Sequence, residues 1–299
     1  MNKLVVILGP TSSGKSSLGI KLARKFHGEI ISADSRQVYK GMDIGTGKVT
    51  KAEQKLAPHH LLDVASPKKQ FTVAHFKPLA LQAIKKIQAK NKLPLLVGGT
   101  PFYIYATIDD LQIPAVVPNK KLRSVLRSKS AAQLFSMLKK LDPKRAANID
   151  RHNPVRLIRA IEIVKATGKP VPALRHPELV SGSKNLLILG LKKDLSRLYK
   201  LIDRRLHTRL NDGMVAEIKK LRKQGVSWKR LQEFGLEYRF VALYLQKHLT
   251  YDEMVTQLKS AIHKFAKRQM TWFKTDSRIK WVTTQKQAEK LVRTYVRTK

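Results

Sequence analysis

Residues 9–16 read GPTSSGKS and match the pattern G-x-x-x-x-G-K-[ST] of a phosphate-binding loop. The segment follows the apolar run Leu4–Leu8 and precedes a stretch with helical spacing, the context that such a loop requires. Its glycines let backbone N–H groups curl around phosphate oxygens, and the following helix N-terminus adds positive potential. The predicted phosphate site comprises Gly9, Pro10, Thr11, Ser12, Ser13, Gly14, Lys15 and Ser16, with the Ser16 hydroxyl as a ligand of Mg²⁺. A plain turn between a strand and a helix is the alternative.

Strand and helix patterns alternate over the first 110 residues. Apolar runs typical of buried parallel strands lie at residues 4–8, 29–33 and 93–97, with a weaker one at 60–64. Residues 15–26 and 72–89 have the spacing of amphipathic helices. This alternation predicts an α/β fold with an open, mostly parallel, P-loop NTPase-like sheet.

The rest of the chain is predicted to be mainly helical. Helical periodicity without strand signal marks residues 120–127, 131–141 and 154–167, and prolines bracket this stretch. We therefore predict three parts: a core at 1–113, an all-helical insertion at 114–184, and a return to the core with a helical C-terminal part at 185–299. Strands are expected at 186–191 and 279–283, and helices at 194–212, 214–224, 237–245 and 251–273.

The charge balance points to a polyanionic partner. Lys and Arg number 60 against 21 Asp and Glu, a net charge of +39, and nucleic acid is the usual partner of such a chain. A generally basic proteome with solvated lysines is the alternative. The chain has no cysteine, which excludes disulfides and thiolate metal sites. Its apolar runs are far shorter than the ~20 residues that span a bilayer, so we expect a cytoplasmic protein without a membrane segment.

The loop does not by itself indicate ATP hydrolysis. An NTPase should carry an acidic residue at the end of a buried strand to hold Mg²⁺, but the run at 93–97 ends in Gly98-Gly99-Thr100. Asp63 is the best candidate for that carboxylate, and its strand is weak. The pattern therefore favours an enzyme that binds phosphate without hydrolysing a nucleotide.

Two polar residues follow predicted strands at their carboxyl ends, where ligands bind in α/β sheets. Asp34 comes after the second strand and could act as a general base, or could cap the next segment. Thr100 comes after the strand at 93–97 and could bond a substrate or serve as a cap. Spacing alone leaves both pairs of alternatives open.

Two basic segments in the C-terminal third could bind RNA or could be structural. Arg204 and Arg205 lie in a basic helix with His207 and Arg209, and a solvated charged face is the alternative. Residues 267–273 mix basic and aromatic side chains, which can stack on RNA bases. For this second segment the spacing favours burial of Met270, Trp272 and Phe273 in the core.

Six segments occur together and in order, and with them the chain resembles the tRNA dimethylallyltransferase (tRNA isopentenyltransferase) family. They are GPTSSGKS at 9–16, SADSRQVYKGMDIGTGK at 32–48, PHHLLDV at 58–64, PLLVGGTPFY at 94–103, LDPKRAANIDRHNPVRLIRAIEIVKATGKP at 141–170 and AKRQMTWF at 266–273. The resemblance spans nearly the whole chain, and the segments at 34–47 and 151–170 are the most specific.

The resemblance implies a P-loop α/β core, a helical insertion and a particular reaction. In that reaction the exocyclic amine of the adenine 3′ of the anticodon attacks the allylic carbon of dimethylallyl diphosphate, and pyrophosphate leaves. It further implies Mg²⁺, a monomer, and tRNAs that read codons beginning with U, recognised at the anticodon stem-loop. The target base must leave its stack to reach a buried site.

The resemblance also implies roles for individual residues. Asp34 matches the general base, Thr100 a residue that positions the adenine, and Arg205 an arginine that reaches the diphosphate. The positions that match tRNA contacts are Asp34, Ser35, Arg36, Gln37, Thr100, Arg123, Val155, Arg156, Leu157, Ile158 and Arg159. The chain departs from the family pattern at Arg209, where Met is usual, at His263-Lys264, where Thr-Arg is frequent, and in Gly235-Leu-Glu-Tyr238, where the family has Gly-Tyr.

Two other classes of function remain as alternatives. An ATP-dependent small-molecule kinase would explain the phosphate loop and would show phosphoryl transfer. A non-catalytic basic RNA-binding protein would explain the charge and would bind RNA without turnover.

Overall fold

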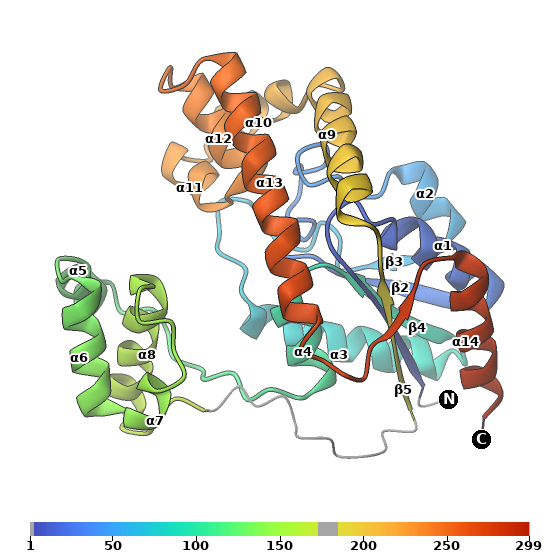
Figure 1. Ribbon diagram of the computed structural model, residues 1–299, viewed down its shortest axis with the longest axis horizontal. Coiled ribbons are helices and arrows are strands. Elements are labelled where there is room, and N and C mark those ends of the chain that lie inside the picture. Colours follow the sequence, from blue (N-terminus) through green and yellow to red (C-terminus); the bar gives the residue numbers. More distant parts are fainter. Residues whose placement is uncertain (1–2, 173–184, 299) are drawn as a thin grey trace. The chain divides into compact units, whose positions relative to one another are not determined.

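The computed structural model describes residues 3–172 and 185–298 of the chain (Figure 1). Six strands form one parallel sheet in the order β3-β2-β4-β1-β5-β6. The strands are β1 (Leu4–Leu8), β2 (Gly28–Ala33), β3 (His59–His60), β4 (Leu93–Gly98), β5 (Leu186–Leu191) and β6 (Lys280–Val282). The predicted α/β fold with a parallel P-loop-type core is confirmed.

The register of the central strands brings three turns to one edge of the sheet. Gly98, the last residue of β4, is paired with Leu8 at the end of β1 and with Ala33 at the end of β2. Because the three strands run parallel and end at the same level, residues 9, 34 and 99 all begin turns at this edge. The edge is therefore the place where the predicted site residues of the core meet.

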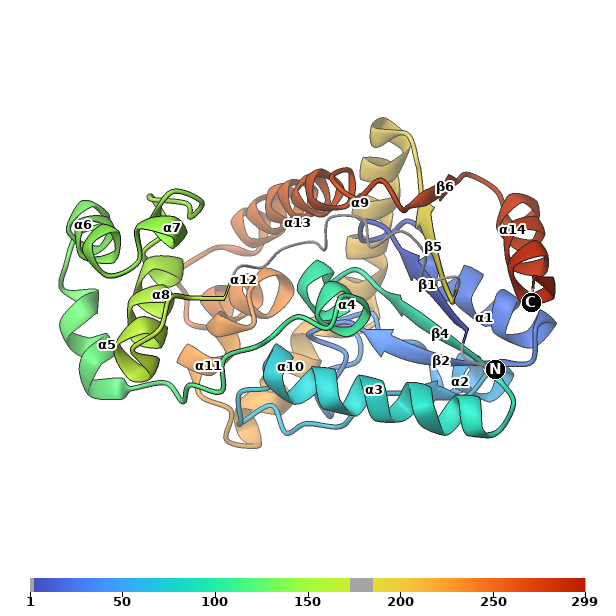
Figure 2. The same cartoon turned by 90° about the horizontal axis from the view of Figure 1, so that it is seen from below.

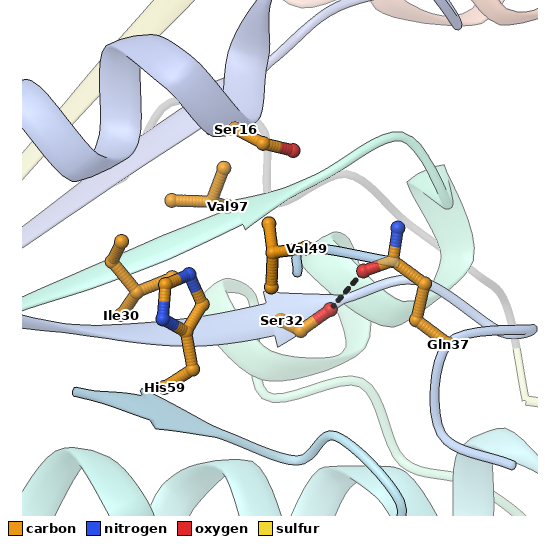
Figure 3. A pocket seen from close by; sticks show the side chains of 7 residues that line it. All are labelled: Ser16, Ile30, Ser32, Gln37, Val49, His59 and Val97. Atoms are coloured by element: carbon orange, nitrogen blue, oxygen red, sulfur yellow. Dashed lines mark hydrogen bonds between the residues drawn. The ribbon is translucent and has the colours of Figure 1, made fainter. Parts of the chain in front are cut away.

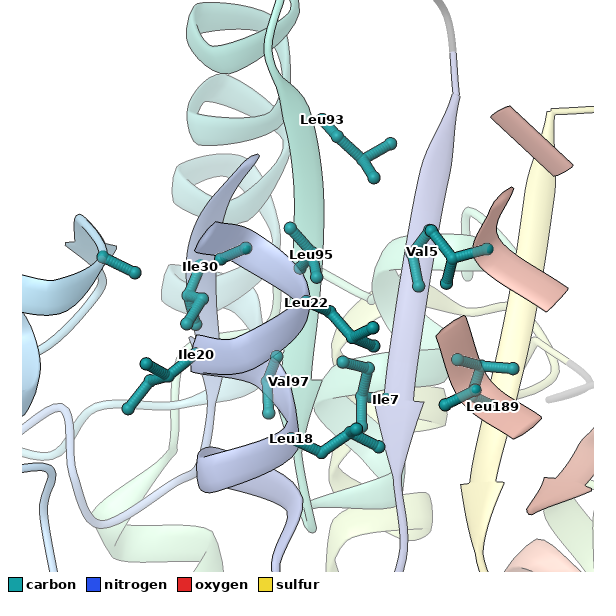
Figure 4. Close-up of a cluster of buried hydrophobic side chains, with 14 of the residues drawn as sticks. Val5, Ile7, Leu18, Ile20, Leu22, Ile30, Leu93, Leu95, Val97 and Leu189 are labelled. Carbon is teal, nitrogen blue, oxygen red and sulfur yellow. The ribbon is translucent and has the colours of Figure 1, made fainter. Parts of the chain in front are cut away.

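Helices cover both faces of the sheet (Figures 1 and 2). One face packs on α1 (Lys15–Lys25) and α14 (Gln285–Arg297), and the other packs on α3 (Val73–Ala89), which in turn contacts α4 (Pro101–Ile108). Figure 4 shows Leu18 and Leu22 of α1 lying against Ile7 and Val97 of the sheet. Both residues of α1 belong to its apolar stripe, so burial of that stripe holds the phosphate loop, which leads into α1, against the sheet.

Helices between β5 and β6 in the chain gather beyond the carboxyl ends of the strands. They are α9 (Leu195–Asn211), α10 (Met214–Lys223), α11 (Trp228–Glu233), α12 (Leu236–Leu245) and α13 (Tyr251–Phe273). Another helix, α2 (Lys51–Leu56), precedes β3. The long helices α9 and α13 are joined by His263, whose Nε2 lies 2.7 Å from Asp203 Oδ1 and whose ring stacks on Tyr199 at 4.0 Å between centroids. This contact fixes the helix that carries Arg205.

The chain divides into two compact units, one of Met1–Ile108 with Leu179–Lys299 and the other of Asp109–Glu178. The second unit is helical, with α5 (Lys120–Arg127), α6 (Ala131–Leu141), α7 (Pro143–Ala146) and α8 (Pro154–Thr167). Side chains of Asn119, Ser130 and Asn153 cap the first free N–H groups of α5, α6 and α8. Leu126, Leu134, Leu138, Leu157 and Ile161 form its fully or almost fully buried core.

Most of the helices and strands predicted from the sequence are present, and a few predictions are wrong. The strand expected at 60–64 is wrong, because β3 is only His59–His60 and the chain then turns away with φ of +63° at Leu61 and +57° at Asp63. Helices α2, α4, α7, α11 and α14 were not expected. All except α14 are short, and short helices give too few repeats of the helical period to stand out in a sequence.

Candidate active site

The phosphate loop adopts the conformation that its glycines and serines permit. It runs from the end of β1 to Lys15, the first residue of α1, with φ of +60° at Ser12 and +96° at Gly14. Positive φ at these two positions turns the backbone so that successive N–H groups can face one anion. Gly14 occupies the N-cap position, so the free N–H groups of α1 open onto the loop.

Lys15 is the cation at the centre of this loop. Its Nζ donates to the Pro10 carbonyl at 2.6 Å. Burial, together with the smaller effect of the nearby Arg205 guanidinium, lowers the pKa of Lys15 to about 7, while Asp34 acts in the opposite direction. An anion placed in the loop would be a negatively charged partner for the Lys15 ammonium and would stabilise its protonated form. The loop is therefore suited to a phosphate group.

The loop faces α9 across a pocket of about 410 Å³. The pocket is lined by Ser12, Gly14, Lys15, Ser16 and Ser17 on one side and by Leu201, Arg204, Arg205 and Thr208 on the other. The four residues of α9 are spaced three, one and three positions apart, which places them on one face of the helix. The sequence left open that Arg204 and Arg205 form only a solvated charged face. This alternative is wrong for Arg205, which is half-buried in this pocket.

Arg204, Leu201 and Thr208 were not among the predicted site residues. Their helical spacing from Arg205 was visible in the sequence, but nothing in that spacing indicated which face of the helix meets the loop. Burial and the Arg209 guanidinium lower the pKa of Arg205 to about 10, which leaves it charged at neutral pH. The pocket thus holds at least one full positive charge opposite the loop.

Asp34 begins a tight turn at the carboxyl end of β2. Its Oδ1 accepts the backbone N–H of Arg36 at 2.8 Å and that of Gln37 at 3.3 Å. The local capping that the sequence left open is therefore present. These bonds also fix the orientation of the carboxylate, so capping and a chemical role are compatible.

Thr100 holds the same turn from the neighbouring strand. Its Oγ1 accepts the backbone N–H of Ser35 at 3.1 Å, and its own N–H donates to the Ala33 carbonyl at 3.3 Å. The sheet order makes β2 and β4 neighbours, and this places Thr100 beside Asp34 although 66 positions of sequence separate them.

The carbonyl of Gly47 connects this turn to the arginine of the phosphate pocket. It accepts Gln37 Nε2 at 3.3 Å and Arg205 Nη2 at 3.2 Å. The structure thereby brings together Lys15, Arg205 and the turn at 34–37 in one region of the core unit.

Two of the departures from the family pattern contact each other beside this region. Arg209 Nη1 lies 3.0 Å from Glu237 Oε1 in an ion pair that is largely buried on both sides. Burial raises the pKa of Glu237, and the Arg209 charge opposes that shift. Since an unpaired charge would be costly in such a place, each residue accounts for the presence of the other.

Gln269 of α13 ties the phosphate loop to β4. Its Oε1 accepts the Thr11 N–H at 2.8 Å and its Nε2 donates to the Gly99 carbonyl. Gln269 was not predicted as a site residue, because the basic and aromatic side chains at 267–273 were the only signals considered in that segment. The expectation of a buried segment holds for Phe273, which is fully buried, and fails for Trp272, which is 38% exposed.

A second cavity, of about 20 Å³, lies below the phosphate loop (Figure 3). It is lined by Ser16, Ile30, Ser32, Gln37, Val49, His59 and Val97. Figure 3 shows the bond between Ser32 Oγ and Gln37 Oε1, which measures 3.3 Å. The space is about that of one water molecule, so it is too small for a substrate.

Asp63, the sequence candidate for a metal-holding carboxylate, is engaged elsewhere. Its Oδ1 lies 2.6 Å from Lys48 Nζ, which also contacts Asp43 Oδ1 at 2.6 Å. Over residues 3–172 and 185–298, no three His, Asp or Glu side chains gather as a metal site. In the same part of the chain no helix combines the length and the hydropathy needed to cross a bilayer.

The remaining predicted residues lie in the helical unit. Glu162, which is almost fully buried, accepts Arg123 Nε at 2.8 Å, Arg159 Nη1 at 2.5 Å and the Asn119 N–H at 2.7 Å. Val155 and Arg156 are exposed, whereas Leu157 and Ile158 pack inside the unit. One face of α8 is thus available to a partner, and Glu162 holds the two arginines at its side.

The fold and the pocket define a P-loop α/β protein with an all-helical insertion. The chain belongs to the IPP transferase family, which matches residues 37–276. A tRNA dimethylallyltransferase of Carboxydothermus hydrogenoformans is 40% identical over 292 residues, which cover 96% of this chain and 93% of that protein. The family resemblance inferred from the sequence is thereby confirmed.

Solved structures agree with this assignment. The full-length tRNA isopentenylpyrophosphate transferase of Bacillus halodurans has a TM-score of 0.74 and 34% identity, covering 99% of this chain and 97% of that one. A eukaryotic dimethylallyltransferase acting on tRNA has a TM-score of 0.75 and 25% identity, covering 95% of this chain and 75% of that one. The likeness therefore includes both the core and the insertion.

Proposed function

We propose that this chain transfers the dimethylallyl group of dimethylallyl diphosphate to N6 of the adenine 3′ of the anticodon, in tRNAs that read codons beginning with U. The family membership and the names of the relatives support this reaction. The observation that carries it is the Gly47 carbonyl, which joins the arginine of the phosphate pocket to the turn of Asp34. A diphosphate near Arg205 and an amine near Asp34 would then be held by side chains that share the Gly47 carbonyl as a common support.

The phosphate pocket would bind the diphosphate and stabilise it as it leaves. Negative charge grows on the leaving oxygen while the bond to the allylic carbon breaks. Lys15 and Arg205 place positive charge on opposite sides of the pocket, and the backbone N–H groups of the loop need no rearrangement. Preorganised charge of this kind stabilises the transition state more than water does.

Asp34 would accept the proton that the adenine amine releases. The new bond forms between N6 and the allylic carbon, the bond from that carbon to the diphosphate oxygen breaks, and the amine proton passes to the Asp34 carboxylate. The bonds from Arg36 and Gln37 hold this carboxylate in one orientation. Thr100 would use its hydroxyl group both to hold the turn, through the bond from the Ser35 N–H, and to position the adenine.

Mg²⁺ fits the donors of this pocket. The Ser16 hydroxyl would be the protein donor, since Mg²⁺ commonly takes one or two protein ligands together with substrate phosphate oxygens and water. When bound, the ion would neutralise charge on the diphosphate. Lys15 and Arg205 supply the remaining positive charge from the protein itself.

The tRNA would be held by the charge of the whole chain and by the helical unit. The net charge of +39 attracts the phosphate backbone, and Arg123, Val155, Arg156 and Arg159 supply groups at the surface of that unit. Leu157 and Ile158 support this face from inside. We keep 114–184 as the proposed limits of the insertion. We also expect a monomer that works in the cytoplasm, where tRNA is used.

Mass spectrometry of digested tRNA tests the proposal. The protein is incubated with dimethylallyl diphosphate, Mg²⁺ and an unmodified transcript of a tRNA that reads a U-starting codon. We expect an adenosine that carries one five-carbon prenyl group. Asp34→Ala should lose roughly 10²–10⁴-fold in rate, because the proton acceptor is removed. The binding of tRNA should be largely kept, because the other cationic groups of a chain with a net charge of +39 remain.

Asp252→Ala is the matched control, since it removes the same charge from an exposed position in the first turn of α13. It should keep the wild-type rate. Equal rates for Asp34→Ala and Asp252→Ala would remove Asp34 from the mechanism. Phosphoryl transfer from ATP without prenylated product would favour a kinase instead, and tight RNA binding without turnover would favour a binding protein.

A further inference from the structure

A half-buried carboxylate holds three consecutive backbone N–H groups of the loop at residues 43–47. Glu217, in the first turn of α10, accepts the N–H of Asp43 at 2.8 Å and of Ile44 at 2.6 Å through Oε2. Its Oε1 accepts the N–H of Gly45 at 3.1 Å and the hydroxyl of Tyr238 at 2.7 Å. One side chain thus satisfies four donors, three of them from one turn.

Consecutive N–H groups that converge on one point form a site for an anion. Here a carboxylate of the protein itself occupies that point, so the loop is organised around Glu217 rather than around a ligand. The turn is also closed from within, because the Gly47 N–H donates to the Ile44 carbonyl at 3.0 Å. Gly45 packs so closely on Tyr238 that a Cβ there would lie 2.8 Å from its ring.

The other side of the same loop meets the candidate active site. The Gly47 carbonyl accepts Arg205 Nη2 and Gln37 Nε2, as described above. Gly47 has φ of +57°, and a Cβ there would lie 2.2 Å from Arg205 Nη2 and 1.8 Å from Arg209 Nη2. Both guanidinium groups therefore rest on this glycine, and its position determines theirs.

We propose that Glu217 is a positioning residue, which fixes the loop at 43–47 and through Gly47 sets the placement of Arg205 toward the diphosphate and of Gln37 beside Asp34. The inference rests on the proposed function, because it assigns Glu217 to the binding of that substrate. Glu217 itself does not touch the diphosphate or the adenine. It acts through the backbone that it holds.

The competing explanation is that Glu217 only joins α10 to α12 through Tyr238. Two substitutions separate these roles. Glu217→Gln has a single acceptor oxygen for four donors, so at least part of the loop loses its partner. Tyr238→Phe removes only the bond between the helices and leaves all three loop N–H groups with their carboxylate.

Steady-state kinetics with dimethylallyl diphosphate and tRNA distinguishes the two explanations. For Glu217→Gln we expect KM for the diphosphate to rise at least about tenfold and kcat to fall, the size expected for losing a charged hydrogen bond. The Kd for tRNA should stay within about twofold, because most of that affinity would come from phosphate contacts with the basic chain, which this substitution leaves in place. Tyr238→Phe should lower the melting temperature and keep both kinetic constants.

Glu253→Gln is the matched control for removing a carboxylate that accepts backbone N–H groups. Glu253 accepts the Thr250 N–H at 2.8 Å in an exposed capping box, where glutamine is an equally good partner. Glu253→Gln should leave KM, kcat, the Kd for tRNA and the melting temperature unchanged. If Glu217→Gln folds poorly, Glu217→Asp takes its place, because it keeps the charge and only shortens the side chain. Its KM for the diphosphate should lie between that of the wild type and the value expected for Glu217→Gln.

An unchanged KM for the diphosphate in Glu217→Gln would overturn the inference, as would an equal rise in Tyr238→Phe. Failure of the proposed function is a different result, namely a wild-type protein that makes no prenylated tRNA. Calorimetric titration with inorganic pyrophosphate then compares wild type with Glu217→Gln directly. Weaker binding by the variant supports the positioning role, and equal or absent binding refutes it.

Discussion

Raising the pH from 7 to 9 should weaken the binding of dimethylallyl diphosphate to the free enzyme by about 50-fold. The prediction follows from Lys15, whose pKa burial and the Arg205 charge lower to about 7. A bound diphosphate would stabilise the ammonium form and raise this pKa well above the working range. Binding therefore takes up a proton whenever Lys15 is neutral in the free enzyme.

The size of the effect is set by the fraction of free enzyme in which Lys15 carries its proton. With a pKa of about 7 that fraction is about one half at pH 7 and about one hundredth at pH 9. The ratio corresponds to about 2.3 kcal/mol of binding free energy. The last proton of a phosphate group leaves near pH 6, so the charge of the substrate is nearly constant over this interval.

Calorimetric titration at several pH values measures this dependence. Lys15→Arg is the control, because arginine keeps its charge throughout the interval, and its affinity should be nearly independent of pH. Lys15→Ala should bind weakly at every pH. An affinity of the wild type that stays constant from pH 7 to 9, or a fall of equal size in Lys15→Arg, would refute the assignment of the proton to Lys15.

Two further substitutions test other parts of the structure. Gly47→Ala should raise KM for the diphosphate about tenfold by displacing the two guanidinium groups, whereas Gly168→Ala, at a similar φ of +65° with nothing within 4 Å, should cost only the backbone strain of about 1–2 kcal/mol and leave KM unchanged. Equal KM values in the two variants, measured by steady-state kinetics, would contradict the role of Gly47. Glu162→Gln should destabilise the helical unit by about 3 kcal/mol, because Arg123 and Arg159 lose a buried partner. Burial acts to raise the pKa of Glu162, but the bonds from these arginines outweigh it and hold the pKa low, so the stabilisation is present at neutral pH and lost as the pH falls below the ordinary carboxyl range. Thermal unfolding at neutral and acidic pH checks both statements, and a variant as stable as wild type at pH 7 would contradict them.

Local signals in the sequence were sufficient for much of the fold. The helices predicted at 120–127, 131–141 and 154–167 have the bounds seen in α5, α6 and α8, because caps and helical periodicity act over a few neighbouring residues. The strand at 60–64 was misjudged for the same reason. An apolar run reports burial, but it does not report the positive φ of Leu61 and Asp63 that turns the chain away.

The candidate site was predictable where its residues follow strands. The loop at 9–16, Asp34 and Thr100 could be placed together because parallel strands end at a common edge. Glu217, Gln269 and the pair of Arg209 with Glu237 could not be found this way. Each of these polar side chains has the spacing of an ordinary helix position, and its partner lies in another element.

By itself, the sequence determined the phosphate loop and the alternation of strands and helices, since each depends on residues close together along it. It also determined the basic character of the chain, which depends on composition alone. Only the tertiary structure decided which groups the loop would face. Arg205 reaches the Gly47 carbonyl across 158 positions, and Gln269 reaches the phosphate loop across 258. Periodicity specifies which face of a helix is buried, but the partner of that face is chosen by packing, which joins segments that no local pattern relates.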